Sequence, residues 1–414
     1  MGHTLFLGSV RESRTKARDP ALTRVQSTLV KCRLIAECLC VFWSMAAMAQ
    51  VSGEFYLEKT TFAPGEPVFL YFKLSNNGPD AVEVVDPDPE QPFCSGVSMK
   101  VSKDPADPST CPIWADHGCS IDGQLLLSPL LPGKSRIDRY LLNFHHDIRT
   151  AGAYWVEATH FDIPGRAVGE VHAKLYFHVD GDVPAFAPSN VHLWVDQLQS
   201  TDQEKRLEAA RTLASLAPPS LEAILLSFAD NPEFLRYAPL AFHRLHSPRS
   251  MKAMADLMKA SGPGTFEHME AARYLAESND LEWYPLLLDA AQKNPGISAY
   301  PAYAAELGGA QMIPVLVDLA KSPDSRLQAV MAMGSTGSPA AIPILLELLK
   351  SPDEAISDRA SYSLRLLTHR TAVRDPRNRD RRAEYVKWSR WWRGEGTTAP
   401  IFKDTECGEP VPLP

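Results

Sequence analysis

The chain has 414 residues, of which 45% are hydrophobic and 22% are charged, and its formal net charge is −8. This composition supports packed cores and excludes a wholly disordered chain, and the length favours two or three domains. No run of 18 or more uncharged apolar residues occurs, which excludes a polytopic membrane protein. The 34 prolines follow no G-X-Y period, so collagen is excluded as well.

The first 49 residues carry the features of an export signal. Lys31 and Arg33 precede a mostly apolar run, residues 34–49, which ends in Ala47-Met48-Ala49. A basic segment, a short apolar run and small residues at the −3 and −1 positions are typical of a secretory signal peptide. We therefore expect cleavage near Ala49 and a periplasmic or extracellular mature protein, with no stable insertion into a membrane after cleavage.

Two alternatives to a signal over residues 1–49 stay open. Residues 1–29 are long and polar for the basic segment of a signal, so translation that starts near Leu29 or Val30 is one of them. A first helix that is amphipathic or buried is the other. Without residues 1–49 the chain has 35 basic and 47 acidic residues. This acidic excess favours solubility and disfavours nucleic acid as a partner.

Four cysteines remain after the signal: Cys94, Cys111, Cys119 and Cys407. An even number of cysteines in an exported protein suggests disulfides, and four cysteines allow three pairings. Full pairing would tie the C-terminal tail to the first domain, whereas one local disulfide with two free or buried thiols is the alternative. None of the four has C-x-x-C spacing, which disfavours zinc binding and thioredoxin-like chemistry.

Residues 51–182 show the period-two alternation of strands that bury one face. Leu70, Phe72 and Leu74 share one face of a predicted strand, and the alternation recurs over residues 171–179. Turns rich in Pro, Gly and Asn separate the predicted strands. Short strands at this spacing predict an antiparallel β-sandwich.

Two pairs of segments in this domain resemble a known family. Phe62–Val68 and Leu74–Gly78 resemble the start of bacterial immunoglobulin-like domains, and Pro132-Gly133 with residues 150–154 resembles their last strands. The resemblance implies an Ig-like fold and says little about function, because these motifs are turn sequences. Residues 86–121 are rich in Pro, Asp and Ser, and we expect them to form a long loop or hairpin insertion held by a disulfide.

After an expected linker over residues 183–198, residues 199–370 change to helical periodicity. Residues 313–324 align with residues 342–353 at an offset of 29, and an Ala-rich helix is predicted after each copy. A single helix pair cannot bury its apolar face alone, so such pairs stack on one another. We expect five or six units of about 30 residues each.

The aligned copies resemble HEAT-like repeats of the bacterial phycobilisome-lyase type. Pro314 and Pro343 suit the first turn of a helix, and Gly308 and Gly337 occupy the turn before each proline. In that family the units are helical hairpins that mediate contacts between proteins. The resemblance implies an α-helical HEAT-type solenoid whose surface binds a partner protein.

Residues 371–414 are expected to form a basic capping helix and a tail. The candidate binding residues of this segment are Arg381, Arg382, Tyr385, Trp388, Trp391 and Trp392. One interpretation is a cap whose aromatic side chains close the end of the solenoid. The other is a patch that binds an anion or a partner through arginines and aromatic faces.

The search for catalytic motifs is negative. No G-x-S-x-G or H-E-x-x-H motif occurs, and Gly133-Lys134-Ser135 lacks the first glycine of a phosphate loop, because that position is Ser128. His243 and His246 have a spacing compatible with two metal ligands, although we interpret them as a packed or solvent-facing pair. A denser set in the β-domain is interpreted as scattered surface residues: His145, His146, Asp147, His160, Asp162, His172 and His178. We expect no catalytic residue, no metal and no cofactor.

The fold predicted from the sequence is an antiparallel, Ig-like β-sandwich followed by an α-helical HEAT-type solenoid. The predicted function is that of an exported, non-catalytic interaction or scaffold protein with an unknown protein partner. One alternative is binding of a protease by the β-sandwich, because its first strands look like those of bacterial proteinase-inhibitor domains. Another is an enzyme, either a metal-dependent hydrolase that uses the histidines of the β-domain or a lyase by analogy with the repeat family.

Overall fold

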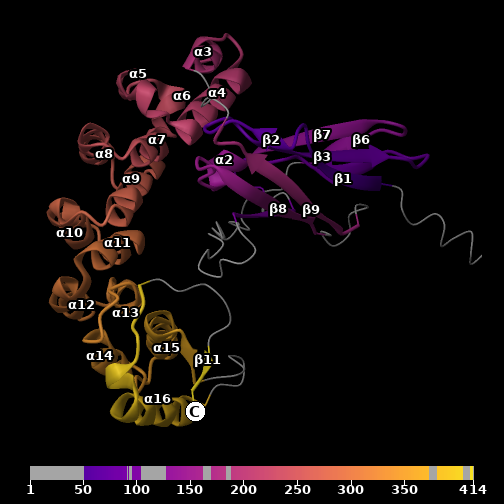
Figure 1. Ribbon diagram of the computed structural model, residues 1–414. Coiled ribbons are helices and arrows are strands. Elements are labelled where there is room, and N and C mark those ends of the chain that lie inside the picture. The colour runs from indigo at the N-terminus through magenta and orange to yellow at the C-terminus, as the bar shows by residue number, and fades with distance from the viewer. Residues whose placement is uncertain are drawn as a thin grey trace, which may run out of the picture.

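The computed structural model has a β-rich region followed by a helical region (Figure 1). It describes residues 51–90, 92, 96–103, 127–161, 169–182, 188–372, 380–403 and 411–413. The predicted signal and the four disulfide candidates, Cys94, Cys111, Cys119 and Cys407, lie outside the described residues. No described helix combines the length and the apolar character that crossing a membrane requires.

The β-rich region contains two main sheets and one additional strand pair. The first sheet is antiparallel, in the order β1 (Val51–Leu57), β3 (Phe69–Asn76) and β7 (Ser135–Leu141). The second has the order β2 (Thr61–Phe62), β9 (Val171–Val179), β8 (Gly152–His160) and β5 (Val97–Ser102). The additional pair consists of β4 (Val82–Val85) and β6 (Leu127–Leu130).

The inner faces of the two main sheets share one hydrophobic core. Phe72 of β3 and Phe177 of β9 are both buried in it, as the period-two alternation predicts. The Phe72 ring stacks on the imidazole of His160 in β8, with ring centroids 4.9 Å apart. His160 is therefore a core residue that joins the sheets, and its prediction as a surface histidine is wrong.

Regular structure occurs in the segment expected as a long loop or hairpin insertion and in the expected linker. β5 lies within residues 86–121, where Val101 pairs with Val156 of β8, so this part of the segment is a strand of the second sheet. Helix α3 (Pro188–Gln197) occupies most of the expected linker. Val191 and Leu198 are buried in the helical core, so packing against the following helices stabilises a helix in this stretch.

The helical region consists of six successive helix pairs among the described residues. The first helices of the pairs are α3, α5 (Glu222–Ser227), α8 (Pro248–Ala260), α10 (Tyr284–Lys293), α12 (Ile313–Leu319) and α14 (Ala341–Leu348). The second helices are α4 (Gln203–Leu216), α7 (Ala238–Leu245), α9 (Phe266–Glu277), α11 (Ala299–Gly308), α13 (Arg326–Gly334) and α15 (Glu354–Thr368). A short helix, α6 (Pro232–Leu235), precedes α7.

The second helices contact one another in sequence order, from α4 to α15, and we call them the inner row. The first helices form the outer row. In Figure 1, α5, α8, α10, α12 and α14 lie on the side of the inner row away from the β-rich region, and α3 lies at the end of the series, above α4. Fully buried alanines allow the helices to pack closely, as with Ala271 and Ala272 of α9 and Ala304 and Ala305 of α11. One continuous core runs through the described helices.

The C-terminal segment closes the last helix pair. Helix α16 (Arg381–Gly394) begins at Asp380, whose carboxylate accepts hydrogen bonds from two backbone N–H groups of its first turn. β10 (Arg370–Thr371) pairs in parallel with β11 (Val411–Pro412), and the backbone N–H of Phe402 donates to the carbonyl of Leu367. These contacts hold the tail against the end of the helical region.

Candidate functional site

The six predicted binding residues lie on α16. Trp388 and Trp391 are buried in the helical core, and Tyr385 and Trp392 pack against it. The indole N–H groups of Trp388 and Trp391 have no hydrogen-bond partner among the described residues. The aromatic side chains thus close the last helix pair, the arrangement expected of a cap.

The arginines of α16 face a different environment from its tryptophans. Arg381 pairs with Glu354 of α15 at 3.2 Å, whereas Arg382 is exposed. Lys350 lies 5.3 Å from the centre of the Tyr385 ring, so this aromatic face already holds a cation. A binding role for the six residues together stays a prediction, because the structure contains no partner that tests it.

The histidines singled out in the sequence are dispersed. His172 and His178 lie on the outer face of β9, and His172 contacts Glu170 at 3.1 Å. His243 stacks on Tyr274, with ring centroids 4.4 Å apart, and its ring centroid lies 6.4 Å from that of His246. No group of three or more potential metal ligands occurs among the residues that the structure describes.

A row of polar side chains crosses three neighbouring helices of the inner row, and we call it the inner ladder. Its members are His243 of α7, Glu270, Arg273, Tyr274 and Glu277 of α9, and Tyr303 and Glu306 of α11. Of these residues only His243 was a candidate from the sequence, and the set as a whole was not predicted. Its signal was the spacing of Glu270, Arg273 and Glu277, which places the three side chains on one face of a helix.

Arg273 is the centre of the inner ladder. Its guanidinium pairs with Glu270 at 2.5 Å and with Glu277 at 2.7 Å, and it lies 3.9 Å from the centre of the Tyr274 ring. The two carboxylates raise the pKa of Arg273 above its ordinary value, in spite of its burial. The Tyr274 ring therefore contacts both the Arg273 guanidinium and the imidazole of His243.

Two further members of the inner ladder are kept neutral. Burial, together with the nearby charges of Arg273 and Arg244, lowers the pKa of His243 to about 4. Burial raises the pKa of Tyr303 to about 12, with Arg273 opposing the shift and the surrounding glutamates adding to it. At neutral pH the inner ladder thus presents a neutral imidazole and a neutral phenol beside fixed charges.

The β-rich region docks on the helical region directly beside the inner ladder. Helix α2 (Leu142–His145) follows β7 and contacts α4, and its Phe144 packs edge-on against Tyr237, with ring centroids 6.1 Å apart. Glu90 of the β-rich region accepts a hydrogen bond from Tyr237 and pairs with Arg236 at 2.6 Å. We call this contact between the two regions the junction.

The junction also contains a buried arginine. Arg244 of α7 is 8% exposed, and burial lowers its pKa to about 10. Its guanidinium donates to the carbonyl of Ser215 in α4 and, at 3.5 Å each, to the carbonyls of Phe144 and His146. Buried backbone carbonyls need such donors, so Arg244 satisfies groups from both regions at once.

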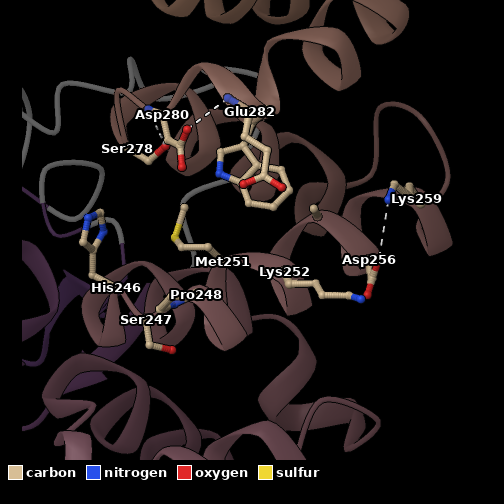
Figure 2. A pocket seen from close by; sticks show the side chains of 12 residues that line it. His246, Ser247, Pro248, Met251, Lys252, Asp256, Lys259, Ser278, Asp280 and Glu282 are labelled. Atoms are coloured by element: carbon tan, nitrogen blue, oxygen red, sulfur yellow. Dashed lines mark hydrogen bonds and ion pairs between the residues drawn. The ribbon is translucent and has the colours of Figure 1, made fainter.

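A groove of about 570 Å³ opens in the outer row, between α8 and the 3-10 turn η3 (Leu281–Trp283) (Figure 2). Met251 and Trp283 supply apolar surface, and the indole N–H of Trp283 is buried with no described hydrogen-bond partner. Charges of both signs line the rim: Lys252, Asp256, Lys259, Asp280 and Glu282. Because the signs are mixed, the groove selects no single charge class of ligand.

Comparison with known families matches only part of the chain. Residues 302–365 match the family model described as HEAT repeats. This range covers α11 to α15, the same pairs in which the sequence shows its internal repeat. No curated protein matches the chain.

Solved structures give remote likenesses. One engineered protein is 24% identical, with a TM-score of 0.26, and covers 43% of this chain and 96% of its own. A second is 22% identical, with a TM-score of 0.25, and covers 43% of this chain and 58% of its own. A segment of alpha-2-macroglobulin from Escherichia coli, from domain MG7 to the C-terminus, is 12% identical with a TM-score of 0.19, covering 77% of this chain and 63% of its own. At such TM-scores none of these likenesses supports an argument about function.

The family match and the paired helices agree with each other over residues 302–365. The chain thus carries a match to HEAT repeats within its helical region, which follows a β-rich region.

Proposed function

We propose that this protein is an exported, non-catalytic scaffold whose helical region is a HEAT-type solenoid that binds a partner protein on its inner row. The observation that carries the proposal is the match to HEAT repeats over residues 302–365, within a longer series of stacked helix pairs. HEAT repeats generally serve as surfaces for protein interaction, because stacked pairs create an extended face without a closed cavity.

The inner ladder is the part of this face that is best prepared for a partner. Arg273 is fixed by two carboxylates and by the Tyr274 ring, so its side chain has little rotamer freedom to lose on binding. Tyr303 offers a half-buried aromatic ring next to it, and buried Tyr and Arg residues dominate the energetics of many interfaces. Fixed charges next to neutral rings favour a specific partner over non-specific adhesion.

We propose that the β-rich region is an Ig-like β-sandwich that the junction holds at one end of the inner row. Its two sheets with a shared core support the sandwich, and the Phe144 and Arg244 contacts support a fixed position. A partner bound to the inner ladder would then also contact the β-rich region. The export proposal rests on residues 1–49 alone, and the predicted role of α16 in binding rests on its arginines and aromatic side chains.

Site-specific photo-crosslinking in the native host tests the proposal. A photoreactive amino acid replaces Tyr303 of α11 in one variant and Asp289 of α10 in a matched control, because Asp289 is an exposed residue of the outer row. We expect irradiation to link the Tyr303 position to one defined protein and the Asp289 position to none. Mass spectrometry of the product identifies the partner.

Equal products at the two positions, or none at either, would reject the inner row as the binding face. Fractionation of the same cells tests export separately. A mature form that begins after Ala49 in the periplasm or medium is expected, and a cytoplasmic full-length chain would overturn the export proposal without affecting the first result.

A further inference from the structure

The charges of this protein are divided unevenly along the chain. Residues 51–369 contain 25 basic and 40 acidic residues, whereas residues 370–393 contain nine basic and three acidic ones. Residues 394–414 after this segment contain one basic and four acidic residues, so the basic excess is confined to the segment that includes α16. An acidic body with one basic segment is complementary in charge to a second copy of itself.

The basic end of the helical region has an exposed face on α16. Four cations there form no ion pair with a described carboxylate: Arg382, Lys387, Arg390 and Arg393. Val386 lies among them with 46% of its surface exposed, while Trp388 and Trp391 fill the opposite, buried face. Terminal units of helical repeats usually present a polar outer face to water, so an exposed valine among unpaired cations is unusual for a cap.

The opposite end of the helical region begins with α3, and the two ends lie far apart in Figure 1. Leu193 of α3 has 58% of its surface exposed, and Asp196 of the same helix is exposed near it. Asp202 and Glu204, at the start of α4, add two exposed carboxylates beside the exposed Lys205, and neither Asp196 nor Glu204 forms an ion pair with a described cation. Each terminal helix thus exposes one large aliphatic side chain among charges, acidic at the first end and basic at the last.

We propose that the α16 end of one copy docks on the α3 end of a second copy, so that the protein assembles head to tail. Val386 and Leu193 supply the apolar contact, and the cations of α16 face the carboxylates around Asp196. A symmetric contact between two α16 ends would bring like charges together, which disfavours a closed dimer. A head-to-tail contact leaves a free end on each copy, so it produces an open series of oligomers.

Sedimentation velocity of the full chain tests the assembly directly. The average mass should exceed that of a dimer as the concentration rises, and the affinity should fall about tenfold between about 0.05 M and about 0.5 M NaCl, because the contact depends on screened charges. A protein that stays monomeric at low salt, or that stops at a dimer, overturns the proposal.

Two variants with one blocked end each make the test specific. The first carries Val386→Asp with Arg390→Glu on α16, and the second carries Leu193→Lys with Asp196→Lys on α3. Each variant alone should be monomeric, and an equimolar mixture should form a dimer and nothing larger, since only one productive contact remains. A matched control, Leu281→Asp, changes another exposed leucine, in η3, and should assemble like the unmodified chain.

Circular dichroism melting of every variant shows that a monomeric variant is folded rather than damaged. A mixture that stays monomeric although both variants are folded would overturn the pairing of these two ends. Assembly of the α16 variant alone at the level of the unmodified chain would do the same. Binding of an acidic partner to α16 that leaves the chain monomeric would reassign this face to a different protein and reject self-assembly.

Discussion

The guanidinium of Arg149 donates a hydrogen bond of 2.8 Å to the backbone carbonyl of Arg244. Arg149 belongs to the β-rich region and Arg244 to α7, and the Arg244 side chain donates in the opposite direction to carbonyls at Phe144 and His146. The two arginines therefore fasten the regions to each other reciprocally. Since each guanidinium is held by a backbone carbonyl of the other region, these contacts favour one orientation of the two regions.

We expect Arg244→Met to lower the free energy of unfolding by about 2–4 kcal/mol, because it leaves buried carbonyls of both regions without a donor. Urea denaturation measures this loss, and amide hydrogen exchange should rise first in α2 and the start of α7. The control is Arg249→Met, an exposed arginine of α8, with an expected effect within about 0.5 kcal/mol. Equal losses of stability in the two variants would show that Arg244 at the junction stabilises the protein no more than an exposed arginine does.

Acid should weaken the junction through its histidines. Burial lowers the pKa of His145 to about 4 and that of His146 to about 3. It also lowers the pKa of the nearby His243 to about 4. A histidine whose pKa is lower in the folded than in the unfolded chain takes up its proton more readily when unfolded. Stability is therefore complete above about pH 6.5, the ordinary histidine pKa, and falls as the pH decreases toward 4.

Burial is the main cause of these low histidine pKa values, and the charged groups that surround the imidazoles modify its effect. Arg244 faces both His145 and His146, Arg211 and Asp88 face His145, and Arg273 and Arg149 face His243. Each imidazole should cost up to roughly 3 kcal/mol by pH 4, because its pKa is about 3 to 4 in the folded chain. The urea midpoint followed from pH 7 to pH 4 measures the sum, and a His145→Gln, His146→Gln double variant should flatten the curve. If the urea midpoint of that variant fell with pH as steeply as that of the unmodified chain, His145 and His146 would be excluded as the cause of the acid destabilisation.

Local periodicity predicts the secondary structure and the buried face of segments whose own side chains determine them. The alternation around Phe72 and Phe177 gives the buried faces of β3 and β9, and the aligned copies give the helix pairs of residues 302–365. Pro314 indeed lies in the first turn of α12, where its missing N–H leaves no bond unmade.

Elements that depend on distant partners could not be predicted in the same way. β5 is a strand because Val101 and its neighbours pair with β8, and nothing in its own proline- and serine-rich surroundings indicates this. The inner ladder joins His243, Tyr274 and Tyr303 from three helices, so its composition is set by the stacking of pairs. Only the i, i+3 and i+7 spacing within α9 was visible in the sequence.

The cap formed by α16 is predicted to contribute strongly to stability. Trp388→Ala removes a side chain that is only 1% exposed and should lower the free energy of unfolding by about 3–5 kcal/mol. Arg382→Ala, on the exposed face of the same helix, should change it by less than about 0.5 kcal/mol. Thermal and urea denaturation compare the two variants. A stable Trp388→Ala protein that loses a partner would instead favour the aromatic residues as a binding patch.

The spacing between α10 and α11 depends on the absence of a side chain at Gly308. A Cβ atom placed there would lie 2.2 Å from the Tyr284 ring, whereas one at Gly394, the last residue of α16, would meet no atom within 4 Å. Gly308→Ala should therefore cost about 1–3 kcal/mol by forcing the two helices apart, and Gly394→Ala should be nearly neutral. Adding Tyr284→Ala to Gly308→Ala should make the cost of the glycine substitution disappear in a double-mutant cycle of urea denaturation. Additive effects would contradict the contact, because they would mean that the glycine and the tyrosine act independently.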